Sequence, residues 1–273
     1  VQITNTQHTF SNSGTLRGTT TGAQGLRVEA AVTTVTNTGT ITGYTDSVGV
    51  KVLSTGSIGT LQNSGQINGG GSNAAITNAG GTITTLNNEA AGSITSTSAD
   101  KAGIFNSQSG VINTISNSGT ISGTTYGVNN SSNSTIGTIT NLGTITGGTA
   151  GIGNFGTLST LNNLQSASSG LSYKGALPTS YNIIINSTSN YGKLVGSDLT
   201  GSTNFGIYTG SIVTTGTYSS VLSGFKSSNL GTTTGTYNGY PWLLNNRTGT
   251  IWDLVIGLST TDTQTSVSSN AAS

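Results

Sequence analysis

The chain has 273 residues, of which only 5% are charged, and its formal net charge is +1. This balance argues against nucleic acid as a partner, because phosphate binding requires clustered Lys and Arg, and the eight basic residues are scattered along the chain. The absence of cysteine excludes disulfides, Cys-ligated zinc and thiol catalysis. Methionine is absent too, and we interpret Val1 as a processed N-terminus, as after removal of a signal peptide.

A short phrase, Asn-x-Gly-x-Ile/Leu, recurs along residues 1–165. Its copies begin at Asn12, Asn37, Asn63, Asn117, Asn141 and Asn154, and a looser copy at residues 91–94 fills the gap in the middle. Successive phrase glycines are 24–27 residues apart; they are Gly14, Gly39, Gly65, Gly92, Gly119 and Gly143. A near-constant period of this length is typical of a solenoid, in which each repeat buries its apolar side against the next.

Within each repeat, apolar residues alternate with Thr, Ser or Asn, as in residues 112–116. This alternation predicts strands with one buried face. A second turn phrase lies between copies of the first, at residues 55–58, 80–83 and 109–112. Together these features predict an all-β fold, a right-handed parallel β-helix with about three short strands per turn.

The phrase residues themselves are predicted to be structural. Asn and Gly both tolerate positive φ, so we interpret each copy as a turn. Equivalent residues of stacked turns lie ~4.8 Å apart, a spacing at which like charges repel and neutral Asn side chains form hydrogen-bonded ladders. A ligand-binding role for the same asparagines is the alternative. The predicted turn and ladder residues are Asn12, Gly14, Asn37, Gly39, Asn63, Gly65, Asn117, Gly119, Asn141 and Gly143.

The composition changes near residue 166. Seven of the nine tyrosines, both tryptophans and both prolines lie beyond this point. A solenoid needs a terminal unit that covers its last rung, because an exposed strand edge promotes aggregation. We therefore predict β-helix repeats over residues 1–165, a β-rich C-terminal capping module over 166–258 and a flexible polar linker or tail over 259–273. The predicted cap core consists of Tyr181, Tyr208, Tyr218, Trp242 and Trp252.

Several segments of this C-terminal region are similar to the end of autotransporter passenger domains. The segments are residues 177–186, 191–194, 205–208, 217–225, 242–245 and 249–254. The resemblance covers about residues 173–258 and implies an autochaperone-like cap, type V secretion, a Gram-negative origin and an extracellular or cell-surface location. In that family an outer-membrane barrel follows the cap, so the resemblance implies that any association with the outer membrane depends on a barrel outside this chain.

Residues with catalytic or metal-binding potential are sparse. His8 is the only histidine, which argues against a Ser-His-Asp triad. Among the seven acids, Asp46 and Asp100 are separated by about two periods, so they could share a face roughly 9.6 Å apart, a spacing compatible with glycoside hydrolysis. We interpret each of them as marking a solvated loop. The segment 69–73 lacks the acid of the calcium-binding nonapeptide. We predict no catalytic residues, no metal and no cofactor.

The leading functional hypothesis is a non-enzymatic extracellular structural or interaction protein that acts in adhesion or self-association. Its expected partners are other copies of itself or a host or surface ligand. Near-zero net charge favours association, and an open first rung at residues 1–10 would allow copies to stack into a filament or surface layer. The alternative is an enzyme acting on polysaccharide, which predicts a groove lined with acids and aromatic side chains. Before residue 166 the aromatics are few: Phe10, Tyr44, Phe105, Tyr126 and Phe155.

Overall fold

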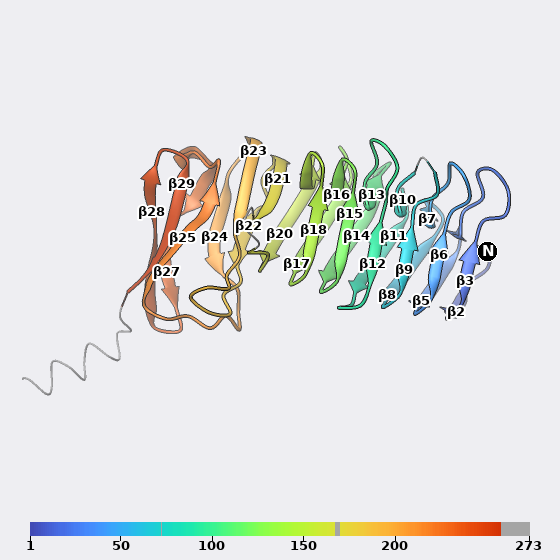
Figure 1. The fold of residues 1–273 in the computed structure, drawn as a ribbon, viewed down its shortest axis with the longest axis horizontal. Helices are drawn as coiled ribbons and strands as arrows, with labels where there is room; N and C mark the ends of the chain where they lie inside the picture. Colours follow the sequence, from blue (N-terminus) through green and yellow to red (C-terminus); the bar gives the residue numbers. More distant parts are fainter. Residues whose placement is uncertain (72, 167–169, 258–273) are drawn as a thin grey trace, which may run out of the picture.

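The computed structural model describes residues 1–71, 73–166 and 170–257 as a single elongated stack of β-strands (Figure 1). About 59% of the chain is strand, and the coil makes about nine turns. The only helical element in the described part is a single 3-10 turn, η1 (Ser227–Asn229). The prediction of an all-β parallel β-helix is confirmed.

Three sheets run along the stack and are called A, B and C here. Sheet A contains, in spatial order, β1 (Gln2–Ile3), β4 (Leu26–Val28), β7 (Val50–Leu53), β10 (Ile76–Ala79), β13 (Ile104–Ser107), β16 (Tyr126–Asn130), β19 (Ala150–Asn154), β21 (Leu171–Ala176), β23 (Leu194–Thr200), β25 (Gly216–Ser223), β29 (Ile251–Ile256), β28 (Tyr240–Thr248) and β27 (Thr234–Tyr237). Sheet B contains β2 (Gln7–Asn12), β5 (Ala31–Asn37), β8 (Ser57–Asn63), β11 (Thr82–Asn88), β14 (Val111–Asn117), β17 (Thr135–Asn141), β20 (Thr157–Asn163), β22 (Ser180–Ile183), β24 (Thr203–Ile207) and β26 (Leu230–Thr232). Sheet C contains β3 (Thr15–Arg17), β6 (Thr40–Thr42), β9 (Gln66–Asn68), β12 (Ser93–Thr95), β15 (Thr120–Gly123) and β18 (Thr144–Gly147).

The interior is built from columns of β-branched and Leu side chains in register. On sheet C, Ile41 pairs with Ile67, and the column continues through Ile94 and Ile121 to Ile145, each fully buried. The strands of sheet B do not alternate strictly. In β11 the buried apolar residues are Ile83 and Leu86, three positions apart, and the pairing register skips the residue between Ile83 and Thr85. Strands β5 to β20 of sheet B skip their third residue in this way, and each therefore changes face there.

The parallel stacking continues beyond residue 166, although the sequence changes there. Strands β21 and β23 extend sheet A in parallel, and β22 and β24 extend sheet B. What ends near this point is sheet C, whose last strand is β18. Among the described strands, the antiparallel pairs are those formed by β25, β29, β28 and β27, which close the far end of sheet A. The hairpin-like part of the predicted cap thus begins at residue 216 rather than 166.

Aromatic side chains continue the interior columns where the third sheet is missing. Tyr181 pairs with Leu161, and Phe205 pairs with Tyr181, with ring centroids 5.7 Å apart. The ring of Trp242 lies 5.5 Å from Phe205, and the indole N–H of Trp252 donates to the carbonyl of Phe225 at 2.8 Å. These rings are enclosed by the chain: Tyr181 is fully buried, and Trp242 and Trp252 are each 7% exposed.

Tyr208 does not belong to this core. It is only half-buried and lies just beyond the end of β24, in which Thr203 and Phe205 point inward. Tyr208 is out of phase with these inward positions, so its ring is directed away from the interior. Tyr173 and Phe225, which the sequence did not single out, are fully buried instead. The predicted tail at residues 259–273 lies outside the described residues.

Candidate functional site

The predicted asparagines form one continuous hydrogen-bonded ladder between sheets B and C. Each Nδ2 donates to the Oδ1 of the asparagine in the next turn at 2.8–3.1 Å, in the order Asn12, Asn37, Asn63, Asn88, Asn117, Asn141 and Asn163. The same Nδ2 groups also donate to main-chain carbonyls; that of Asn117, for example, reaches Gly119 and Thr144 at 3.2 Å. From Asn37 onward these side chains are at most 1% exposed, so their polar atoms are committed to the fold.

A second ladder, not anticipated from the sequence, lies between sheets A and B. It runs through Asn78, Asn106, Asn130 and Asn154, with amide-to-amide distances of 2.8–2.9 Å. The phrase copy at Asn154 therefore belongs to this ladder and not to the first. The ladder begins at Asn78 because Val52 occupies the equivalent position of the preceding turn, and the Oδ1 of Asn78 is left without a partner.

The phrase glycines serve close packing and not positive φ. None of Gly14, Gly39, Gly65, Gly119 and Gly143 has a left-handed backbone, contrary to the turn interpretation above. A Cβ on Gly39 would lie 2.1 Å from the carbonyl oxygen of Gly14, and the later glycines meet the preceding turn in the same way. In the copies that belong to the first ladder, from Asn37 onward, the Asn is the ladder residue and the Gly makes a close backbone contact that no other residue permits. The Ile or Leu is a core residue of sheet C.

A trough lies on the outer face of sheet A. Two hollows of about 190 and 240 Å³ share Asn73, Thr77 and Phe105, which makes them parts of one depression. Its floor carries one outward side chain per turn, in strict register from Lys51 through Thr77 and Phe105 to Asn129. The remaining lining comes from the corners on either side, including Gln24, Ser47, Asp46, Asp100, Lys101 and Gln108.

One wall of the trough consists of the connections from sheet C to sheet A. These span residues 18–25, 43–49, 69–75 and 96–103 in the first four turns, but only 124–125 and 148–149 in the next two. The long connections are hydrogen-bonded to one another: the backbone N–H of Gly70 donates to Ser47 at 2.7 Å, and the hydroxyl of Ser96 donates to Asn73 at 2.8 Å. The wall is therefore continuous along the stack.

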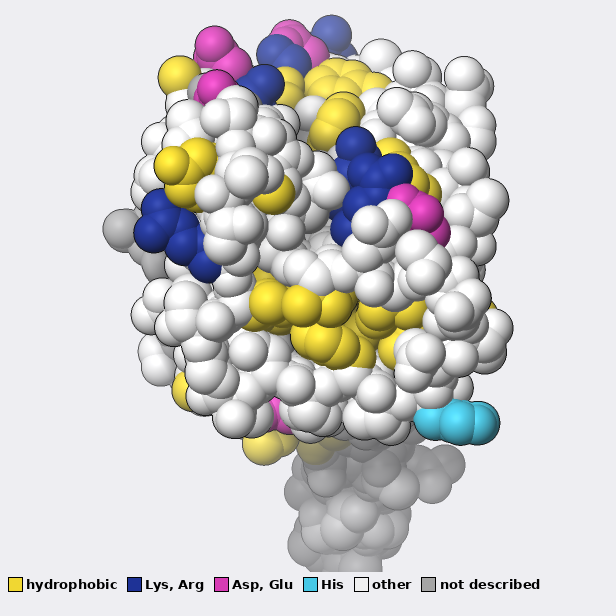
Figure 2. Space-filling view, turned by 90° about the vertical axis from the view of Figure 1, so that its right-hand side faces the viewer, with side chains coloured by type: hydrophobic (Ala, Val, Ile, Leu, Met, Phe, Trp, Pro, Cys, Tyr) yellow, Lys and Arg dark blue, Asp and Glu magenta, His cyan; other side chains and the backbone are white. Residues whose placement is uncertain are grey.

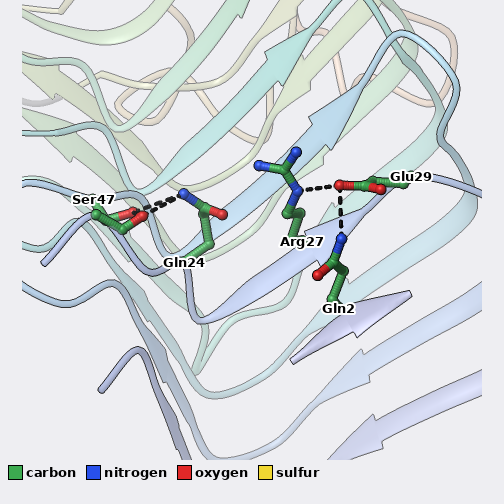
Figure 3. A network of polar contacts seen from close by, with 6 residues as sticks. Gln2, Gln24, Arg27, Glu29 and Ser47 are labelled. Atoms are coloured by element: carbon green, nitrogen blue, oxygen red, sulfur yellow. Dashed lines mark hydrogen bonds and ion pairs between the residues drawn. The ribbon is translucent and has the colours of Figure 1, made fainter. Parts of the chain in front are cut away.

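Polar contacts fix the wall and the adjoining strands near the first turns (Figure 3). The amide of Gln24 donates to the hydroxyl of Ser47 at 3.1 Å. On the neighbouring strands, the carboxylate of Glu29 accepts from Arg27 and, at 2.9 Å, from the amide of Gln2. Glu29 thereby balances Arg27, which stands in register with Lys51 on the next turn.

Asp46 and Asp100 lie in corresponding connections from sheet C to sheet A, two turns apart. Both have a left-handed backbone, with φ of 60° and 59°, and the other long connections place Gly22 and Gly71 in the same conformation. Asp is one of the few residues that tolerates this conformation, so the turn alone accounts for both acids. Each borders a different hollow of the trough, and His8 is exposed on β2, away from both.

An aromatic shelf continues the floor of the trough beyond Asn129. The next outward position in register is Gly153, and a Cβ there would lie 2.6 Å from the ring of Tyr126, so this ring covers the glycine. The ring of Phe155 meets that of Tyr126 edge-on, with centroids 5.9 Å apart and planes at 72°. Next to the shelf, an ion pair at 2.7 Å raises the pKa of Lys174 and lowers that of Asp198.

The N-terminal end of the stack presents a second surface of interest. Strands β1, β2 and β3 are the edge strands of the three sheets at this end. Hydrophobic side chains gather at the centre of this end, surrounded by polar atoms (Figure 2). The half-buried Phe10 and Leu16 pack against the core from this first turn, and Val1 is exposed.

Comparison with protein-family models, with curated proteins and with solved structures returned no match for this chain. Within the described ranges, no three His, Cys, Asp or Glu residues are grouped so that they could hold a metal ion. No described helix is long and apolar enough to cross a membrane.

Proposed function

We propose that this protein is a non-enzymatic structural or interaction protein that works outside the cell, in adhesion or self-association. The observation that carries the proposal is the trough on sheet A, a surface that crosses several turns of a stiff stack. The two ladders and the glycine contacts occupy the polar groups of the interior corners. The side chains free to meet a partner are therefore those of the outer face and of the ends.

The proposal includes assignment to secreted passenger domains of type V systems in Gram-negative bacteria. Its support is the resemblance of residues 173–258, together with a coil that ends in antiparallel strands. An elongated stack of this kind suits display of a surface away from a cell. Self-association would use the edges of β1, β2 and β3, which a second copy can pair with.

The test is a display experiment with the purified chain coupled to beads. We expect the beads to adhere to cells or to one another, and we expect ordered assemblies of the free chain by negative-stain microscopy and concentration-dependent sedimentation. A chain that stays monomeric at high concentration and leaves the beads dispersed and non-adherent would overturn the proposal.

A second candidate is an enzyme that cleaves polysaccharide. It is favoured by the position of Asp46 and Asp100, which border adjoining hollows of the same trough. Release of reducing sugar from a glycan panel, lost in both Asp46→Asn and Asp100→Asn, would establish it. Equal release by the wild type and both variants, or none at all, would reject it.

A further inference from the structure

We propose that the trough on sheet A binds an uncharged linear polysaccharide, with Phe105 and the Tyr126 ring as stacking platforms on either side of Asn129. This inference rests on the proposed function and names the class of ligand for it. Five kinds of observation carry it: the spacing of the floor, the placement of the rings, the polar groups of the lining, its charge, and the pairing of the strands beneath.

The floor repeats once per turn. Lys51, Thr77, Phe105 and Asn129 stand in register on successive strands, so outward groups recur at ~4.8 Å along the stack. This interval is close to the length of one pyranose unit in an extended chain. From β7 to β16 the floor crosses three strand spacings, or roughly 14 Å, which suits several units of a polymer better than one small molecule.

The two rings are placed where successive sugar units would lie. Phe105 is half-buried on the floor and lines both hollows. Tyr126 lies over Gly153, the position next to Asn129 in register, and its ring is held edge-on by Phe155. The C–H faces of pyranose rings stack on aromatic rings of this kind, and rigid rings supply contact area at low conformational cost.

The polar lining suits hydroxyl groups. Between the rings, the side-chain Oδ1 of Asn129 is buried and has no hydrogen-bond partner. The side-chain amides of Asn73 and Gln24 lie on the wall side of the trough. Such groups both donate and accept, as sugar hydroxyls do.

The charges of the lining cancel. Lys51 and Lys101 are offset by Asp46 and Asp100, which border the same two hollows. An anionic polymer would meet both carboxylates, and a cationic one would meet both ammonium groups. An uncharged chain pays neither cost.

An extended peptide is disfavoured by the pairing of the sheet. Peptides that add a strand need an unpaired edge, but strands β4 to β16 each pair with a neighbour on both sides. The trough therefore presents side chains to a ligand, and a peptide cannot form main-chain hydrogen bonds with the strands beneath it.

The experiment is affinity electrophoresis of the full chain through gels containing mannan, β-glucan, galactomannan or xylan, with alginate and heparin as anionic probes. Isothermal titration with oligosaccharides of increasing length follows on any retarding polymer. We expect retardation by at least one neutral polysaccharide, weak or no retardation by the anionic probes, and affinity that rises with chain length and then levels off.

Variants locate the binding. Phe105→Ala and Tyr126→Ala are each expected to weaken affinity about ten-fold, as the loss of one stacking ring implies, whereas Tyr126→Phe keeps the ring and the affinity. Leu142→Ala is the control, since Leu142 is 49% exposed and follows β17, outside the trough. Circular dichroism establishes that each variant is folded.

Three outcomes would overturn the inference: no retardation by any neutral polymer, retardation by anionic polymers alone, or binding that Phe105→Ala and Tyr126→Ala leave unchanged. The bead assay separates this failure from failure of the proposed function. Beads that adhere or cluster without binding a neutral glycan leave an interaction protein whose trough has another role. Beads that stay inert, with no glycan binding, reject both proposals.

Discussion

Replacement of a central ladder residue provides the most direct test of how this stack is held together. In Asn117→Ala the protein loses one bond accepted from Asn88, at 2.8 Å, and three donated bonds, to Asn141, Gly119 and Thr144, at 2.9–3.2 Å. Because the amide group has only two hydrogens, the three donated contacts count as two full bonds, and each full bond contributes about 1 kcal/mol net. An acceptor left buried without a partner costs about 1–3 kcal/mol more. The Oδ1 of Asn141 would be such an acceptor. We therefore expect a loss of about 4–6 kcal/mol in the free energy of unfolding.

Asn12→Ala is the matched control at the first rung. Asn12 is half-buried and donates three bonds, to Asn37, Gly14 and Thr40, at 2.8–3.1 Å. Water can replace these bonds in part because the first rung is open on one side, so a loss of about 1 kcal/mol is expected. Guanidinium denaturation followed by circular dichroism measures both variants. If the two midpoints shift equally, the buried ladder is not what distinguishes the central rungs, and the reasoning is wrong.

Asn117→Asp adds a pH test at the same position. The carboxylate can still accept from Asn88, but it cannot donate, and it places a charge against the Oδ1 of Asn141. Burial then raises the pKa of the new carboxyl above its unfolded value, so the neutral acid is favoured in the folded state. The variant should be destabilised at neutral pH and should recover stability, relative to the parent chain, as pH falls through the folded pKa. Absence of any such recovery would contradict a buried site.

Three further predictions concern other parts of the fold. Gly119→Ala should destabilise the chain severely, because the new Cβ would lie 2.2 Å from the carbonyl oxygen of Gly92. In Gly14→Ala the new Cβ has no atom within 4 Å, so the thermal midpoint should stay within a few degrees of the parent value. Tyr181→Phe should keep or raise stability by about 1 kcal/mol in urea titrations, because the buried hydroxyl has no hydrogen-bond partner; a clear loss would reveal a bond that the structure lacks. Burial raises the pKa of Tyr173 and Tyr181 above the ordinary 10.0, so these tyrosines ionise at lower pH in the unfolded chain than in the folded one. The free energy of unfolding should therefore fall as pH rises above about 10. Denaturation midpoints that stay level from about pH 9 to 11 would contradict this.

The repeat made the architecture predictable, while the details of the corners were harder to foresee. The 24–27-residue period and the recurring Asn are visible in the sequence, and they give the stack and its first ladder. The second ladder left a signal of the same kind, since Asn78, Asn106, Asn130 and Asn154 recur at similar intervals. It was hidden because no single phrase surrounds these residues. The role of the glycines could not be read from φ preferences, because the contact that requires them comes from the preceding turn.

The candidate site was beyond reach of the sequence for a different reason. Phe105, Tyr126 and Phe155 are scattered among small residues, and only the register of sheet A brings Tyr126 over Gly153 and beside Phe155. Tyr208 shows the converse: it is aromatic and lies in the C-terminal region, but it is out of phase with the inward positions of its strand. Composition indicates how many rings a region has, whereas the phase of each strand decides which of them enter the core.

The distribution of connection lengths explains why the surface is hollowed where it is. The first ladder and the sheet C column run without a break through β3 to β18, so the coil itself is uniform over these turns. The connection from sheet C to sheet A varies most, from seven or eight residues in the first four turns to two in the next two, whereas the other two kinds of connection span two to four residues in these turns. A longer connection adds main chain on the outside of the coil and buries small side chains such as Ala75 and Ala102. Loop closure costs little more for these few extra residues. The stack therefore supplies a constant frame, and the wall of the trough is an addition that could change length or side chains without loss of the fold. Replacing the connection 96–103 by a two-residue connection, Thr-Thr as at residues 124–125, tests this. The hollow beside Lys101 should disappear, and the free energy of unfolding should stay within about 1 kcal/mol of the parent value. A variant that does not fold would show that the long connections are part of the frame.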